Sequence, residues 1–234
     1  MMPQLQKNAR IAGFFYLLMT VTGPFILIYV PGKLFVTGNA SATVANILAN
    51  QTLFRSYIVV GLLSELFFIA AVFALYRLLK EVDQWLAKLM VIVVLVDAPT
   101  AFLAIANQLA TLSLIQGSDL LSVFDKPQRD AVATLLINFD RLALPVSELF
   151  WGLWLLPLAA LVYRSGFLPR FLGVWLCLNG LAYVVISLTG IVMPEHYKTV
   201  NTFSFPILLG EVAFMLWLLI VGAREGLRKK EVLS

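Results

Sequence analysis

Four carboxylic acids lie inside long apolar stretches of the 234-residue sequence: Glu65, Asp97, Glu148 and Glu211. A charged side chain at the centre of a membrane-spanning helix costs about 2.5–3.5 kcal/mol. Four isolated charges would together cost on the order of 10–14 kcal/mol, which is comparable with the stability of a whole protein. Each acid must therefore carry a proton, pair with another group or face a polar interior. We interpret the four as the lining of one internal site, with hydrogen-bonded contacts between helices as the alternative.

Two further polar residues fall on the same helical faces as two of the acids. Gln108 follows Asp97 by about three helical turns, and Arg141 precedes Glu148 by about two turns. Prolines lie close to three of the acids, and a proline leaves a backbone carbonyl free to bind a cation or a polar ligand group. The predicted ligand-binding residues are Glu65, Asp97, Glu148, Glu211, Asn179, Tyr183, Gln108 and Arg141.

Glu65 lies near the middle of an apolar stretch that contains no proline. Its position, about ten residues from either end, places it roughly 15 Å deep in a spanning helix. The small residues Gly61 and Ser64 leave room beside it for another helix or for a ligand. We therefore expect Glu65 to face the interior of the bundle and to carry a proton at neutral pH when no ligand is bound.

Residues that would support other chemistries are scarce. The chain has one histidine, His196, and one cysteine, Cys177. A zinc site built from several histidine and cysteine ligands is therefore not expected. Neither a nucleotide-binding motif nor a nucleophile-elbow motif occurs in the sequence. We predict neither a metal nor a cofactor.

Three functions stay open on the residues alone. The first is binding or transport of a cation, an amine or a polar lipid headgroup, coupled to protons through Glu65 or Asp97. The second is an intramembrane enzyme acting on a lipid or isoprenoid, with carboxylates as acid and base or as ligands of a metal such as Mg²⁺. The third is a structural or regulatory membrane subunit. Whether the chain is an enzyme is undecided at this point.

The elements that carry these residues are predicted to be membrane-spanning helices. The chain is 61% apolar and only 13% charged, and its mean hydropathy is +0.91. Soluble domains are about 45–50% apolar and about 25% charged. A helix needs roughly 20 apolar residues to cross a bilayer core about 30 Å thick. Six segments meet this requirement: Ile11–Val30, Phe54–Leu78, Leu86–Leu114, Leu142–Tyr163, Phe171–Val192 and Phe203–Ala223.

The predicted fold class is an all-α bundle of six transmembrane helices, with residues 1–234 forming a single integral membrane domain. If the N-terminus is cytoplasmic, eleven of the 17 basic residues lie inside, and the outer six are Lys33, Arg55, Lys126, Arg129, Arg141 and Lys198. This bias predicts that both termini are cytoplasmic. The basic residues form no single patch, so nucleic-acid binding is not expected. The predicted partners are membrane lipids and a small-molecule or lipid ligand, and a homo-oligomer is left open.

Short amphipathic helices are expected in the outer loops. Ser41 is predicted to cap one that carries Val44 and Ile47 on its apolar face. The stretch Pro127–Asp140 has a similar pattern and either lies on the outer surface or extends the fourth span. We favour the extension, because no helix breaker intervenes before Pro145.

On the opposite side, the fourth and fifth spans are joined by a tight hairpin. Gly166 is predicted to end one helix in the left-handed conformation. Pro169 suits the first turn of the next helix, where its missing N–H group leaves no hydrogen bond unmade.

Several segments resemble a known family. They are Arg10–Leu17, Ala42–Arg55, Tyr163–Gly173, Asn179–Tyr183 and Gly210–Trp217. Together they resemble the bacterial membrane family catalogued as domain of unknown function 4386, over nearly the whole chain. The resemblance implies a multi-pass protein of the bacterial inner membrane and a recurring acid at Glu211. It implies neither a reaction nor a ligand.

Overall fold

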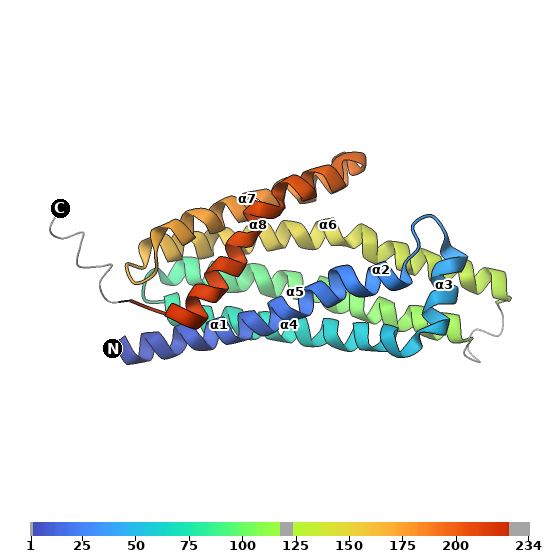
Figure 1. Cartoon of the computed structure of the whole chain (residues 1–234), viewed down its shortest axis with the longest axis horizontal. Helices are drawn as coiled ribbons and strands as arrows, with labels where there is room; N and C mark the ends of the chain where they lie inside the picture. Colours follow the sequence, from blue (N-terminus) through green and yellow to red (C-terminus); the bar gives the residue numbers. More distant parts are fainter. Residues whose placement is uncertain (1, 118–123, 225–234) are drawn as a thin grey trace. The chain divides into compact units, whose positions relative to one another are not determined.

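The computed structural model describes residues 2–117 and 124–224, and these residues form helices and no strand. Most of these residues lie in long helices, and the short helices α2 and α3 lie between α1 and α4 (Figure 1). In chain order the elements are α1 (Met2–Pro24), the π-helix η1 (Phe25–Tyr29), α2 (Val30–Leu34), α3 (Ala40–Ala49), α4 (Gln51–Leu79), α5 (Gln84–Gln116), α6 (Lys126–Arg164), α7 (Arg170–Val192), the 3-10 helix η3 (Pro194–His196), α8 (Tyr197–Leu216) and the π-helix η4 (Trp217–Val221).

Six helical segments in the described part of the chain are long and apolar enough to cross a membrane. This confirms the predicted all-α architecture with six spans. The first segment runs over Met2–Leu34 and is longer than predicted. Helix α1 begins at Met2, so that Lys7 and Arg10 lie within it. The last segment begins at Pro194 and not at Phe203, because the predicted loop continues as helix.

The stretch Pro127–Asp140 forms the first part of α6, the longest helix, at 39 residues (Figure 1). Two prolines, Pro145 and Pro157, lie inside α6 without ending it. A proline within a helix removes one backbone hydrogen bond, and neighbouring groups in a helical bundle can satisfy the carbonyl that it frees. Pro127–Asp140 therefore extends the fourth span, which is the alternative that the sequence favours.

The chain divides into two compact units. Unit 1 comprises Met1–Leu18, Phe67–Ala98 and Pro145–Ser234, and unit 2 comprises Met19–Leu66 and Pro99–Leu144. Helices α1, α4, α5 and α6 contribute residues to both units, whereas α7 and α8 belong to unit 1 alone. The expectation of a single domain stays a prediction.

In unit 1, glycines bring the backbones of neighbouring helices into close approach. A Cβ atom added to Gly152 of α6 would lie 2.6 Å from the carbonyl oxygen of Gly180 on α7. A Cβ atom on Gly173 would lie 2.9 Å from the carbonyl oxygen of Ala159. Small residues let helices pack backbone to backbone where lipid supplies no hydrophobic driving force. The glycines therefore fix α7 on α6.

The turn between α6 and α7 has the conformation that the sequence predicts at Gly166. This glycine has a φ of +67°, in the left-handed region that favours glycine. Pro169 stands one position earlier than expected, at the N-cap of α7. Beyond α7 the chain turns back through η3, and α8 runs antiparallel to α7 (Figure 1).

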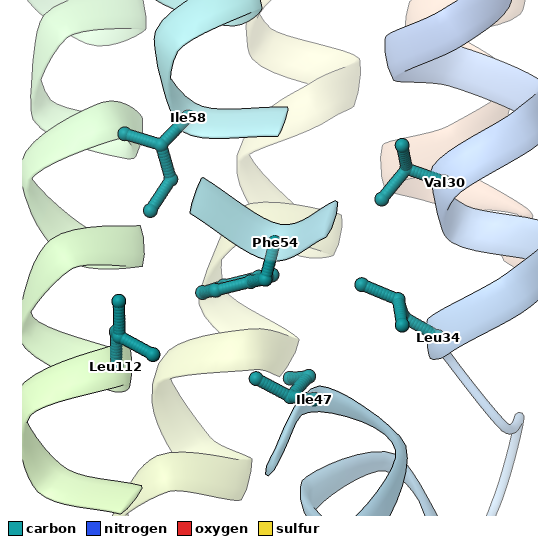
Figure 2. Close-up of a cluster of buried hydrophobic side chains, with 6 residues drawn as sticks. All are labelled: Val30, Leu34, Ile47, Phe54, Ile58 and Leu112. Atoms are coloured by element: carbon teal, nitrogen blue, oxygen red, sulfur yellow. The ribbon is translucent and has the colours of Figure 1, made fainter. Parts of the chain in front are cut away.

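Unit 2 has its own hydrophobic core. Side chains from α2, α3, α4 and α5 surround Phe54, which is 1% exposed (Figure 2). The cluster consists of Val30, Leu34, Ile47, Phe54, Ile58 and Leu112. The short helix α3 enters this core through Ile47. Its N-cap is Asn39 and not Ser41, because the Asn39 Oδ1 atom accepts the Ala42 N–H group at 2.9 Å.

Candidate functional site

Glu148 is a buried acid on α6, only 5% exposed. Its Oε1 atom accepts a hydrogen bond from the hydroxyl of Tyr197 at 2.6 Å. Its Oε2 atom is buried and has no hydrogen-bond partner. An unsatisfied polar atom in a protein interior is energetically unfavourable and calls for a specific explanation. Glu148 therefore has one oxygen held in place and one available to a further group.

Asp97 on α5 is 3% exposed and lies beside the same region of α6. The hydroxyl of Ser147 and the indole of Trp151 face its carboxyl group as hydrogen-bonding partners. These two residues flank Glu148 in the sequence, at one position before it and one helical turn after it. The Oδ1 atom of Asp97 is buried and has no hydrogen-bond partner. Asp97 therefore resembles Glu148: hydrogen-bonding partners hold its carboxyl group, and one carboxyl oxygen has no partner.

Glu211 on α8 is held between two tyrosines. The hydroxyl of Tyr16, on α1, donates a hydrogen bond to its Oε1 atom. The hydroxyl of Tyr183, on α7, is a second hydrogen-bonding partner. Tyr16 is almost fully buried and contacts Trp154 and Phe214 through its ring. Glu211 therefore links α8 to α1 and α7 within unit 1.

Tyr183 and Trp151 connect the three acids. Their rings contact edge to face, with centroids 5.8 Å apart. Tyr183 also interacts electrostatically with Glu148 and with Tyr197. We call this set the acid–tyrosine cluster; its members are Asp97, Glu148, Glu211, Tyr16, Tyr183, Tyr197 and Trp151. All of them belong to unit 1.

Among the described residues, the acids of the cluster have no basic counterpart. In the described part of the chain, salt bridges are formed by Glu81, Asp83, Asp130 and Glu195, and by none of the three cluster acids. Tyrosine hydroxyls and an indole are hydrogen-bond donors, but they carry no positive charge. The cluster is therefore rich in oxygen ligands, and its described members include no cationic side chain.

Asn179 is completely buried on α7 and ties this helix to α8. Its Nδ2 atom donates to the carbonyl oxygen of Leu208 at 3.1 Å. One turn earlier, the indole of Trp175 donates to the carbonyl oxygen of Ile207 at 3.0 Å. The amide oxygen of Asn179 is buried without a hydrogen-bond partner. Asn179 and Tyr183 thus hold α8, and with it Glu211, against α7.

The other predicted site residues belong to unit 2. Gln108 interacts there with Asp140 and lies 3.5 Å from the hydroxyl of Tyr57. Glu65 is half-buried on α4. The side chain of Arg141 lies outside the described residues. The expected lining of one site by all eight residues therefore stays a prediction, because the structure brings together those of unit 1 only.

Sequence reasoning did not assign two partners that the structure supplies. Tyr197 falls in a segment predicted as loop, yet it lies in the first turn of α8 and binds Glu148. Asp140 was expected in an amphipathic extension, but it accepts a hydrogen bond from Asn107 at 2.6 Å. Both residues lie outside the predicted spans, so they were not treated as polar groups within the membrane.

Among the described residues, no group of three or more histidine, cysteine, aspartate or glutamate side chains is placed to hold a metal ion. A comparison with curated proteins and with solved structures gives no match. A family model does match residues 11–222, and its description is domain of unknown function, DUF4386. This match covers most of the chain and all members of the acid–tyrosine cluster. The chain therefore belongs to the DUF4386 family.

Proposed function

We propose that this multi-pass membrane protein binds a small organic cation, of the protonated-amine type, at the acid–tyrosine cluster of unit 1. We further propose that it transports this cation in exchange for protons. The observation that carries the proposal is the pair of buried carboxyl oxygens, Asp97 Oδ1 and Glu148 Oε2, that have no hydrogen-bond partner. An ammonium group donates up to three hydrogen bonds and brings a positive charge, which no described member of the cluster supplies.

The aromatic residues of the cluster support an organic cation as the ligand. Trp151 and Tyr183 stand next to the acids and contact each other edge to face. The face of an aromatic ring attracts cations, and the attraction reaches about 2 kcal/mol when the cation is desolvated. Carboxylates beside aromatic rings therefore suit an alkylammonium or arylammonium ion.

Proton exchange follows from the burial of the acids. A carboxyl group in a low-dielectric interior favours its neutral form, and a neighbouring cation favours the charged form. Entry of the amine is thus expected to release protons, and protonation of the acids to release the amine. Tyrosine hydroxyls can both donate and accept hydrogen bonds, so Tyr183 and Tyr197 suit proton transfer among the acids.

The cellular setting is part of the proposal. The apolar helices and the excess of basic residues on one side favour the inner membrane of a bacterium, with both termini in the cytoplasm. In this orientation the short turn that contains Gly166 faces the cytoplasm, and η3 faces outward.

Binding of benzylammonium to the purified full-length protein, followed by isothermal titration calorimetry, tests the proposal. Asp97→Asn and Glu148→Gln should each weaken binding at least about 30-fold, because each removes one partner of a buried charge pair. Glu81→Gln is the matched control, since Glu81 is an exposed acid in the turn between α4 and α5. It should leave the affinity unchanged.

Two further measurements separate charge recognition from apolar binding and from folding. Benzyl alcohol has the same ring without the charge and should not compete with benzylammonium. The elution volume and helical circular dichroism of each variant should match those of the parent protein. Equal binding of benzylammonium by the parent, Asp97→Asn and Glu148→Gln proteins would contradict the proposal.

A further inference from the structure

The N-terminal part of α1 presents two chemically different faces. The face packed into unit 1 carries Ala9, Ala12, Gly13 and Tyr16, all of them buried. The other face carries Lys7 and Arg10, both exposed, followed by Phe14, which is 50% exposed. Lys7 and Arg10 form no salt bridge among the described residues. This face is independent of the acid–tyrosine cluster.

The exposed face forms a groove with a volume of about 590 Å³. Gln6, Lys7 and Arg10 line its polar part, and Ile11, Phe14 and Phe15 line its apolar part. The two parts follow each other along the helix axis, so that Lys7 and Phe14 are separated by about 10 Å. The rings of Phe14 and Phe15 contact edge to face, with centroids 5.8 Å apart.

This order of side chains matches the anatomy of a phospholipid. Basic residues at the end of a spanning helix lie at the level of the headgroups, and the following apolar turns lie in the hydrocarbon. A lysine and an arginine on one helical face supply charge-assisted hydrogen bonds to phosphate oxygens, which the guanidinium can make in pairs. We propose that the groove binds one anionic phospholipid, with its phosphate at Lys7 and Arg10 and an acyl chain along Ile11 and Phe14.

The groove lies beside the end of η4. The amide of Gln6 donates to the carbonyl oxygen of Val221 at 2.9 Å, so the end of η4 lies against this turn of α1. Immediately after η4, the guanidinium of Arg224 lies 5.5 Å from the centroid of the Trp217 ring. Basic residues near a membrane surface each contribute about 1 kcal/mol to the attraction of anionic lipids.

The side chains of residues 225–234 do not complement the groove in charge. They carry Arg228, Lys229 and Lys230 against two acids, so their net charge has the same sign as that of Lys7 and Arg10. Like charges repel, and a basic segment does not complement a basic groove. An anionic headgroup complements it in charge, and an acyl chain complements Ile11 and Phe14 in polarity.

Native mass spectrometry of the purified full chain tests this site. The protein is titrated with dioleoylphosphatidylglycerol and, separately, with dioleoylphosphatidylcholine, which has the same chains but no net charge. The anionic lipid should bind more tightly. Lys7→Gln combined with Arg10→Gln should weaken its binding roughly 30-fold, and each single substitution roughly fivefold. Binding of the zwitterionic lipid should not change.

The matched control removes two positive charges at positions outside the groove. Lys33 and Lys198 are exposed basic residues outside the groove, and Lys33→Gln combined with Lys198→Gln should leave the affinity for phosphatidylglycerol unchanged. An equal loss in this control would overturn the proposal, because attraction would then depend on total charge alone. Equal affinity of the parent protein for both lipids would overturn it as well. So would equally effective competition by glycerol phosphate, because the groove would then be an anion site without a lipid chain.

Discussion

At Glu148, one tyrosine hydroxyl provides the hydrogen bond that holds a carboxyl group inside the membrane protein. The donor, Tyr197, lies on α8 and reaches Glu148 on α6 across 2.6 Å. Asp97 and Glu211 are held in the same manner by neutral donors from other helices. Among the described residues, the acids are therefore held by neutral donors and are not paired with basic side chains. Hydrogen bonds fix their positions and leave two carboxyl oxygens available.

Tyr197→Phe should destabilise the protein by about 1–3 kcal/mol, because a buried carboxyl oxygen then loses its only donor. The free energy of unfolding in mixed detergent micelles measures the effect. Tyr163→Phe is the control, since Tyr163 is 45% exposed and its ring contact with Arg170 does not require the hydroxyl. That variant should change the stability by less than about 0.5 kcal/mol. Equal stability of the two variants would show that the Tyr197 hydroxyl does not support Glu148.

At the scale of the elements, glycines decide how α6 and α7 meet. Gly152 and Gly180 face each other, and an added Cβ atom on either would meet the other's carbonyl oxygen at less than 3.0 Å. The same crossing brings Trp151 next to Tyr183. The close backbone approach therefore also sets the geometry of the acid–tyrosine cluster.

Gly152→Ala should cost about 1–3 kcal/mol of stability, because the new methyl group would lie 2.6 Å from the backbone of α7 and force the helices apart. Gly61→Ala is the matched control within another spanning helix, since nothing lies within 4 Å of its added Cβ atom. Alanine is the better helix former by roughly 1 kcal/mol, so this variant should be neutral or stabilised. The same unfolding assay compares the two. A loss of stability in both would argue against the crossing.

At the scale of the whole molecule, the six candidate spans determine which turns lie on the same side of a membrane. An uninterrupted series of six crossings places the turn after α4 and the turn after α7 on opposite sides. The distribution of basic residues predicts that the turn after α4 lies in the cytoplasm. This assignment rests on the sequence alone.

Cysteine labelling in intact cells tests the orientation. In a Cys177→Ala background, Glu195→Cys should react with a membrane-impermeant maleimide, because Glu195 is exposed in the predicted outer turn. Glu81→Cys, at the equally exposed turn between α4 and α5, should react only after the cells are lysed. The reverse pattern would place both termini outside. Labelling of both variants in intact cells would contradict the six-span topology.

The sequence by itself determined the spans and the identity of the acids within them. The length of an apolar stretch is a local property, and so is the need of a spanning helix for about 20 such residues. For that reason Phe171–Val192 was predicted to within one residue of α7. The extension of the fourth span over Pro127–Asp140 was also predicted. The starts of the first and last spans were missed, because a helix continues through polar residues when nothing breaks it.

Only the tertiary structure decided which groups hold the acids. The hydrogen bond between Tyr16 and Glu211 joins residues 195 positions apart, and the bond between Tyr197 and Glu148 spans 49 positions. Helical periodicity orders the residues of one helix, but it does not say which helices become neighbours. Which helices become neighbours depends on where their backbones can approach, as α6 and α7 do at Gly152 and Gly180. Such contacts involve both helices at once, so neither helix sequence specifies them alone.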